Sequence, residues 1–256
     1  TEDGNIWFWS EPDVKDMNKL SHFHSIKERL EVSCAPDLES LDGLENLTEL
    51  GTLKLARNPR LANLRGLRNL RKLTRLDLVG NQILTSLDGL QHVSKFDGGI
   101  SIGYSNLKHV DALAFLLDVS FLYLSSNPEL ENLEGLRFIK SDRGRLTVSD
   151  HRVLGNLDGL RSLERVDQEV IISYNDRISN LDGLQNVTHM GGALKIMHNP
   201  LLENLDGLSN LKSVGDVYIV ENESLPKQTV DGFLSSLRAK GWDGMAVVAA
   251  NGDDYD

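Results

Sequence analysis

Short segments in which apolar and polar residues alternate recur along the whole chain, and each is followed by an asparagine or another small polar residue. Residues 53–58, 76–81 and 194–199 show the pattern most clearly, as Leu-x-Leu-x-x-Asn or Leu-x-Ile-x-x-Asn. An alternation of period two places every second side chain on the same face of a strand. Each segment therefore predicts a strand with one inward-facing apolar pair.

Between these segments the apolar residues recur at every third position, as in the series Leu202, Leu205, Leu208, Leu211 and Val214. A spacing of three favours a compact return path, 3₁₀-like or extended, over a long helix. The tetrapeptide Leu-Asp-Gly-Leu lies inside this path at 41–44, 87–90, 157–160, 181–184 and 205–208. Asp-Gly is a turn signal, and we expect its glycine to adopt a positive φ.

The asparagines that follow the strands align into one column whose members lie 22–24 residues apart. Ten coils then cover residues 4 to 226 or so. A stacked asparagine supplies both a donor and an acceptor to the backbone of buried turns, which need such partners. The predicted ladder consists of Asn58, Asn81, Asn127, Asn175, Asn199 and Asn222, with His151 as a hydrogen-bonding substitute.

The two ends of such a stack must be capped, because each coil buries its leucines only against its neighbours. We interpret 1–256 as a single solenoid, with an N-terminal cap coil at 1–26 and repeats at 27–226. In the remainder, 227–256, residues 227–240 carry apolar positions at helical spacing and end at Gly241, which predicts a capping helix. Residues 245–250 predict one last strand, and 251–256 an acidic, frayed tail.

The repeat unit resembles the leucine-rich-repeat superfamily, and within it the receptor L-domain-like branch. Residues 199–214, followed by Gly215 and Val217-x-Ile219, are similar to that branch's unit, and so are residues 190–194. The resemblance implies an α/β solenoid: a right-handed coil with one parallel sheet of about ten strands and a C-terminal capping helix. It also implies binding and adhesion at a cell surface, of the bacterial surface or lipoprotein type, and no catalysis. The cysteine that the family often carries near its last coil is replaced here by Lys227 and Gln228.

Composition narrows the possible partners. The net charge of −11 argues against nucleic acid or an anionic membrane as partner. A single cysteine, Cys34, excludes an intrachain disulfide and a cysteine-based zinc site. No apolar run is long enough to span a membrane. We expect no cofactor and no metal. The chain begins at Thr1, which fits either a removed signal peptide, with a lipid anchor upstream of Thr1 as one option, or a trimmed chain.

The candidate partner-binding residues lie on the outward positions of the strands, the surface that solenoids typically use. Aromatics are only 6% of the chain, so their placement on this face is informative, because exposed aromatics form binding hot spots. For Trp7 and Trp9, packing under the N-terminal cap is an equal alternative. The candidates are Trp7, Trp9, Phe121, Tyr123 and Tyr218, the rim residues Tyr104 and Tyr174, and the cations Lys54 and Lys195.

A second candidate is a basic collar in which seven cations fall within nineteen residues that contain no acid. It would dock an anionic partner or glycan, whereas the alternative is an ordinary solvated surface. The collar consists of Arg57, Arg60, Arg65, Arg68, Arg71, Lys72 and Arg75.

One pattern points to catalysis. Residues 99–103 match the Gly-x-Ser-x-Gly elbow of serine hydrolases, but the register puts Ser101 in mid-strand and not on a sharp turn. We therefore expect a non-enzymatic recognition or adhesion module, secreted or at the cell surface, that binds a protein or glycan through its sheet face. The alternative is a cytoplasmic regulatory scaffold that binds a partner enzyme.

Overall fold

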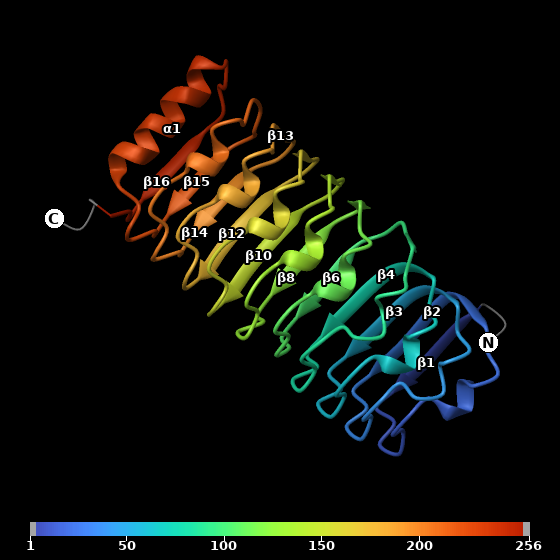
Figure 1. The fold of residues 1–256 in the computed structure, drawn as a ribbon. Coiled ribbons are helices and arrows are strands. Elements are labelled where there is room, and N and C mark those ends of the chain that lie inside the picture. The colour runs from blue at the N-terminus through green and yellow to red at the C-terminus, as the bar shows by residue number, and fades with distance from the viewer. Residues whose placement is uncertain (1–3, 253–256) are drawn as a thin grey trace.

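The computed structural model describes residues 4–252, which form an elongated stack of parallel strands with the two ends of the chain far apart (Figure 1). The main sheet has twelve strands, as β5 pairs with β4 beside the principal path, and every described pair is parallel. Along that path lie β1 (Asn5–Trp9), β2 (Ser25–Ser33), β3 (Glu49–Ala56), β4 (Lys72–Val79), β6 (Ile100–Gly103), β8 (Leu122–Ser125), β10 (Leu146–His151), β12 (Val170–Asn175), β14 (Leu194–Met197), β15 (Val217–Val220) and β16 (Ala246–Ala249). The predicted α/β solenoid with one long parallel sheet is confirmed.

The return path contains the compact turns that the three-residue spacing predicts. Short 3₁₀ helices form at three of the five Leu-Asp-Gly-Leu tetrapeptides: η5 (Asp158–Leu160), η6 (Asp182–Leu184) and η7 (Asp206–Leu208). They also form at the equivalent position of three other coils, η2 (Arg65–Leu67), η3 (Asp111–Leu113) and η4 (Glu134–Leu136), while η1 (Asn18–Leu20) lies in the N-terminal cap. A second parallel sheet, which the sequence analysis did not predict, joins β7 (Asp118–Val119), β9 (Ser141–Asp142), β11 (Arg165–Val166) and β13 (His189–Met190); β5 is Lys95–Phe96.

The expected reason for the glycines in these turns is wrong for most of them. Gly43 and Gly89 do have a positive φ, of 104° and 121°, but the glycines inside the 3₁₀ helices do not. They are needed for close approach between coils. A Cβ on Gly183 would overlap the carbonyl oxygen of Leu157, and one on Gly207 that of Leu181. Because glycine has no Cβ, each coil can pack directly against the backbone of the preceding coil.

The predicted asparagine ladder is confirmed, and every member is buried. The side chain of Asn58 donates to the carbonyl of Val32 at 2.9 Å, while its Oδ1 accepts the backbone N–H of Ala35 at 3.1 Å. His151 takes the same place, with Nδ1 3.1 Å from the carbonyl oxygen of Asn127, and burial lowers the pKa of its imidazole.

The ladder has one further member that the sequence analysis placed in a frayed tail. Asn251 is buried, donates to the carbonyl of Ile219 at 2.9 Å, and accepts the backbone N–H of Asn222 at 3.1 Å. The assignment of this residue to a frayed end was wrong, because the ladder continues past the capping helix. The rest of the predicted tail, 253–256, lies outside the described residues.

The residue just before each ladder position has a left-handed backbone. Ten non-glycine residues have φ between 52° and 58°, and Gly80 has the same place in its coil. β-Branched side chains, which tolerate this region poorly, are absent from the column. The column contains Ser10, Cys34, Arg57, Tyr104, Ser126, Asp150, Tyr174, His198, Glu221 and Ala250.

The C-terminal end is capped as predicted. Helix α1 (Lys227–Ala239) covers the last coil, Gly241 follows it with φ 92°, and β16 adds the final strand beside β15 (Figure 1). The indole N–H of Trp242 donates to the carbonyl of Gly215 at 2.8 Å, which fastens the cap to the stack.

The core is a continuous column from Val14 to Trp242 that consists mainly of Leu, Ile and Val, as the low aromatic content predicts. One carboxyl interrupts it. Asp142 is 1% exposed and stands in β9 where the adjacent strands have Val119 and Val166. Its two oxygens accept the backbone N–H groups of Leu122, at 3.1 Å, and Gly144, at 2.8 Å.

Candidate partner-binding face

The outward side of the main sheet carries the predicted aromatic residues, and the strand register fixes their order. In each strand the residue between the inward pair points outward, so that Asp77, Ser101, Tyr123 and Thr147 are register neighbours on adjacent strands. Tyr123 is 37% exposed. Regular pairing thus turns residues distant in sequence into one continuous surface.

A shallow hollow of about 310 Å³ lies at the centre of this face. The ring of Phe121 lies over Gly99, where a Cβ would overlap the ring, and the guanidinium of Arg75 is 4.9 Å from the ring centre. The hollow is lined by Arg75, Ser101, Phe121, Tyr123, Arg145 and Thr147. It therefore offers an aromatic floor between two arginines, a combination enriched in binding hot spots.

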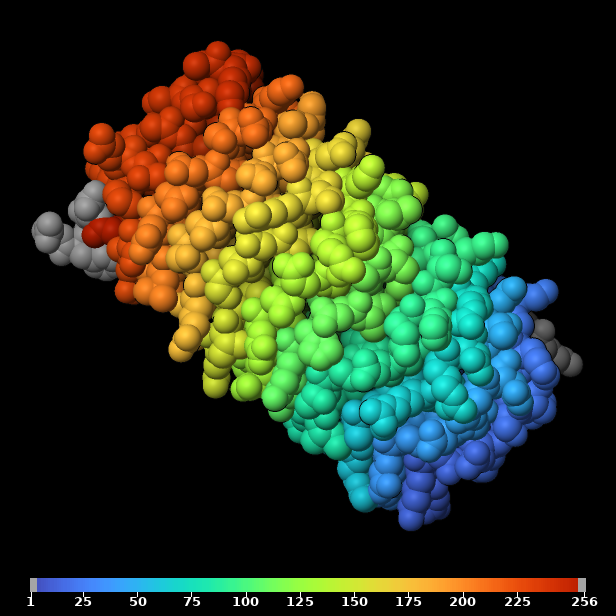
Figure 2. All heavy atoms as spheres, in the orientation of Figure 1, coloured from blue at the N-terminus to red at the C-terminus, as the bar shows by residue number. Residues whose placement is uncertain are grey.

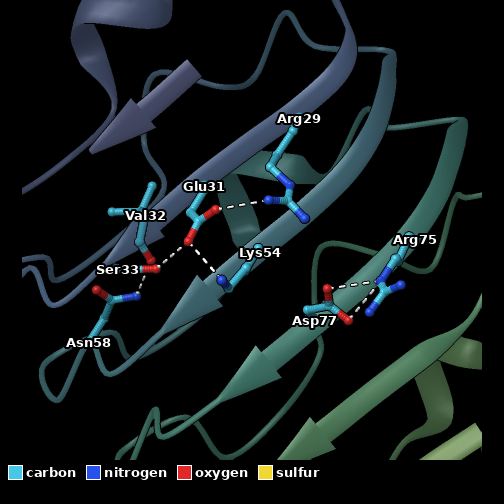
Figure 3. A network of polar contacts seen from close by, with 8 residues as sticks. All are labelled: Arg29, Glu31, Val32, Ser33, Lys54, Asn58, Arg75 and Asp77. Atoms are coloured by element: carbon cyan, nitrogen blue, oxygen red, sulfur yellow. Dashed lines mark hydrogen bonds and ion pairs between the residues drawn. The ribbon is translucent and has the colours of Figure 1, made fainter. Parts of the chain in front are cut away.

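On the N-terminal side of the hollow, the carboxylate of Glu31 is almost buried between cations (Figure 3). It contacts Arg29 at 3.2 Å and Lys54 at 2.8 Å, and it accepts a hydrogen bond from Ser33 at 3.1 Å. Burial alone would raise the pKa of Glu31, but the hydrogen bonds from Lys54 and Ser33 and the two nearby positive charges lower it below the ordinary value. The predicted cation Lys54 is thus already engaged within the protein.

A similar arrangement lies on the C-terminal side. Glu169 contacts Arg145 at 2.9 Å and Lys195 at 2.5 Å. The ammonium of Lys195 also lies 5.5 Å from the ring centre of Tyr218. Between the two networks, Asp77 pairs with Arg75 at 2.9 Å (Figure 3). The charged side chains of the face hold one another in place before any partner arrives.

The sequence analysis did not select Arg29, Arg145 or Glu169. They precede the inward pair of their strands, in the same column as Arg75 and Phe121. Comparing this column across the coils would have placed Arg145 beside Glu169, whereas Arg29 pairs with Glu31 of its own strand.

The remaining predicted aromatics lie at the margins of the face. Trp7 and Trp9, in the edge strand β1, are 60% and 63% exposed, so they do not pack under the N-terminal cap. Tyr104 and Tyr174 are exposed at the rim, in the column with left-handed backbone. Tyr174 stacks on His198 with ring centres 4.2 Å apart, and His198 Nδ1 is 2.7 Å from Glu221.

The basic collar does not form one patch. Its residues are distributed around the coil: Arg57 and Arg60 lie at the turn after β3, Arg65 and Arg68 on the return path, and Arg75 on the sheet face. Several are paired with acids of the preceding coil, such as Arg60 with Asp37 and Glu39, and Arg68 with Glu45. Arg71 and Lys72 are exposed at the start of β4.

Ser101 lies in mid-strand, facing outward, as the register predicts. No histidine lines the hollow beside it, and the carboxylate of its register neighbour, Asp77, is paired with Arg75 at 2.9 Å. Among residues 4–252 no group of three or more His, Cys, Asp or Glu side chains is arranged to hold a metal ion. Over the same range, no helix has the length and apolar character needed to cross a bilayer.

Comparison with known proteins gives a limited result. No family model and no curated protein matches the chain. Among solved structures it is similar to an internalin from Listeria monocytogenes, with 15% sequence identity, a TM-score of 0.38, and coverage of 92% of this chain and 83% of that one.

The assignment of the fold therefore rests on the chain's own geometry. A 22–24-residue period, one inward-facing strand pair per coil, a buried asparagine ladder and a continuous parallel sheet occur together over its length. These are the defining features of one repeat architecture. The protein is a leucine-rich-repeat solenoid.

Proposed function

We propose that this protein is a recognition module that binds a partner protein through the outward face of its main sheet, centred on the hollow around Tyr123. The observation that carries the proposal is the hollow itself, where Phe121 and Tyr123 lie between Arg75 and Arg145. Aromatic and arginine side chains contribute most to affinity at protein interfaces.

The shape of the face supports a macromolecular partner over a small metabolite. The hollow is shallow and lies in an extended, rigid sheet, whereas small-molecule sites are usually enclosed. An ion pair within β4 fixes Arg75, and one to the adjacent coil fixes Arg145, so that less side-chain freedom is lost on binding. A fitting partner surface inserts an apolar side chain into the hollow and offers acceptors to the two guanidinium groups.

The finer parts of the proposal concern where the protein acts. We place it outside the cell or at the cell surface, as an adhesion or recognition protein, on the strength of the receptor L-domain-like repeat unit. Protease treatment of intact cells tests this placement, because a surface protein is digested and a cytoplasmic scaffold is protected. A glycan partner would also use the hollow, and competition with free sugars would reveal it.

The binding surface is tested with the double variant Phe121→Ala/Tyr123→Ala. Loss of two hot-spot aromatics is expected to weaken binding of the native partner by at least about thirtyfold. The matched control is Phe138→Ala, which removes an exposed ring on the return path that is likewise covered by an arginine, Arg137, at 4.7 Å. Equal binding by the double variant and the wild type would contradict the site.

A further inference from the structure

The return side of the solenoid has a column of backbone hydrogen bonds with one rung missing. In this column an N–H of each coil donates to a carbonyl of the coil before it. The pairs are Thr48 to His24, Arg71 to Thr48, Ser94 to Arg71, Lys140 to Leu117, Glu164 to Lys140, Thr188 to Glu164 and Lys212 to Thr188. Within residues 4–252 no such bond joins Leu117 to Ser94.

Strand pairing is interrupted at the same place. β5 pairs with β4, and β7 pairs with β9, but β5 and β7 do not pair with each other among the described strands. The sheet β13-β11-β9-β7 therefore ends at β7 with an open edge in the middle of the molecule. The interruption is local. Ser120, which follows β7 directly, donates its backbone N–H to the carbonyl of Gly98 at 2.8 Å, and β4, β6 and β8 are paired a few residues further along the same coils.

The coil that follows the gap differs from the others in two ways. From Ser105 to Asn127 it spans 22 residues, the shortest spacing of the ladder column, and Ala112 stands where most coils have the glycine that packs against the preceding carbonyl. Phe115 occupies the position at which Asn69 and Asn186 donate a hydrogen bond to the preceding coil, and the two adjacent coils have His92 and Phe138 there.

The separation produces a groove of about 520 Å³ between the two coils, a volume within the usual range of ligand pockets. The rings of Phe96 and Phe115, with centres 6.1 Å apart, form its apolar part, and Leu117 is 58% exposed beside them. Two exposed carboxylates, Asp97 and Asp118, lie at its rim.

The charged side chains that line the groove are Asp97, Asp118 and Arg143, two acids and one base, which gives a net charge of −1. The guanidinium of Arg143 donates to the backbone carbonyl of Asp97 at 3.2 Å and keeps its positive charge. The carboxylate of Asp118 accepts a hydrogen bond from Ser141 at 2.5 Å and keeps further acceptor capacity. In a chain of net charge −11, this rim favours a cationic side chain.

We infer that this groove binds an extended peptide segment of a partner protein, which adds as a strand to the open edge of β7 and places a basic residue beside an apolar one. An unpaired strand edge presents N–H and C=O groups that another chain can pair with, and strand addition is a common mode of peptide recognition. The N–H of Leu117 and the carbonyl of Ser94 supply the main-chain partners, while Phe96 and Phe115 receive the apolar side chain.

The occupant is a separate chain segment. The described ends of this chain lie at the two ends of the solenoid, whereas the groove lies between β4 and β8, near its middle (Figure 1). The space-filling view shows the same elongated shape, with the first described coils (blue) and the capping helix (red) at opposite ends (Figure 2). The groove lies beside the hollow around Tyr123, since Arg143 lines the groove and Arg145 the hollow, but the two share no lining residue, so that each can be tested with its own variants.

The test uses capped peptides titrated into ¹⁵N-labelled protein. The probe Lys-Val-Lys-Val-Lys alternates basic and β-branched residues; one comparison peptide has methylated central amides, and another has glutamate in place of lysine. The basic probe should shift the amide signals of Leu117 and Val119 and slow their hydrogen exchange. The methylated and acidic peptides should bind at least about tenfold more weakly, because they lack main-chain donors or the complementary charge.

Two variants link the probe to the groove. Asp97→Lys/Asp118→Lys should reverse the preference from the basic to the acidic peptide, whereas Asp88→Lys/Asp206→Lys, with the same charge change at exposed turns, should leave it unaltered. Ala112→Gly/Phe115→Asn introduces the glycine of the adjacent coils and the inter-coil amide donor of Asn69 and Asn186, and it should abolish probe binding without loss of folding. Equal binding of the methylated peptide, or no shift at Leu117 at millimolar probe, would overturn the proposal.

Discussion

The carboxyl of Asp142 makes the stability of the solenoid depend on pH in a direction opposite to that of most acids. Burial raises its pKa from the ordinary 3.8 to about 6, the charge of Asp167 adds to this, and hydrogen bonds from Gly144 and Leu122 oppose it. A shift of about two units corresponds to about 3 kcal/mol of differential interaction between the two protonation states.

The sign follows from linkage. Because the folded state binds this proton more tightly than the unfolded state, ionisation of Asp142 destabilises the fold. The full destabilisation of about 3 kcal/mol is present above pH 6, and most of it is relieved as the pH falls from 6 towards 4. A carboxylate with a depressed pKa, such as Glu31, contributes in the opposite sense.

The variant Asp142→Asn separates this residue from the other titrating groups. The substitution itself changes the free energy of unfolding, because the amide has only one of the two acceptor oxygens that face Leu122 and Gly144. This change is the same at every pH, because the amide does not ionise. Urea unfolding of both proteins between pH 4 and 8 should give a stability difference that changes by about 2–3 kcal/mol, with the wild type gaining at low pH. A difference independent of pH would refute the reasoning.

Three further substitutions test how the coils hold together. Gly183→Ala should destabilise the fold by at least about 1–3 kcal/mol, because its Cβ meets the carbonyl of Leu157, whereas Gly155→Ala, with open space around it, should be nearly neutral in the same urea titration. Asn199→Ala should cost at least about 2 kcal/mol by leaving buried backbone groups without partners; a smaller loss would mean that water replaces the amide. Arg57→Gly should raise the melting temperature, because a non-glycine residue in the left-handed region costs about 1 kcal/mol that glycine does not. A lower melting temperature would show that the contacts of the Arg57 side chain stabilise the fold by more than this cost.

The repetitive part of the structure could be predicted from the sequence because every coil has the same pattern of apolar and polar residues. The Leu-x-Leu alternation predicts the strands, the three-residue spacing predicts the return path, and the asparagine column predicts the turns. Asn251 was not predicted as a ladder residue because it lies 29 residues after Asn222, with the capping helix between them, and therefore does not fit a period of 22–24 residues.

The parts that could not be predicted depend on contacts between coils. Gly183 and its equivalents appeared as turn residues, and only the packed structure shows that they make room for a neighbouring carbonyl. The pairing of Lys54 with Glu31, and of Lys195 with Glu169, requires the register between strands. The groove beside β7 lies at a coil that keeps the repeat pattern apart from its 22-residue length and Ala112, and neither departure predicts a gap from sequence alone.

The most direct test of the account is a comparison of the proteins retained from native extracellular and surface fractions by three immobilised forms: wild type, Phe121→Ala/Tyr123→Ala, and Phe138→Ala. The account predicts a partner retained by the wild type and by Phe138→Ala but lost from the double variant, while all three melt within a few degrees of one another. A partner retained equally by all three forms would contradict recognition through the sheet face.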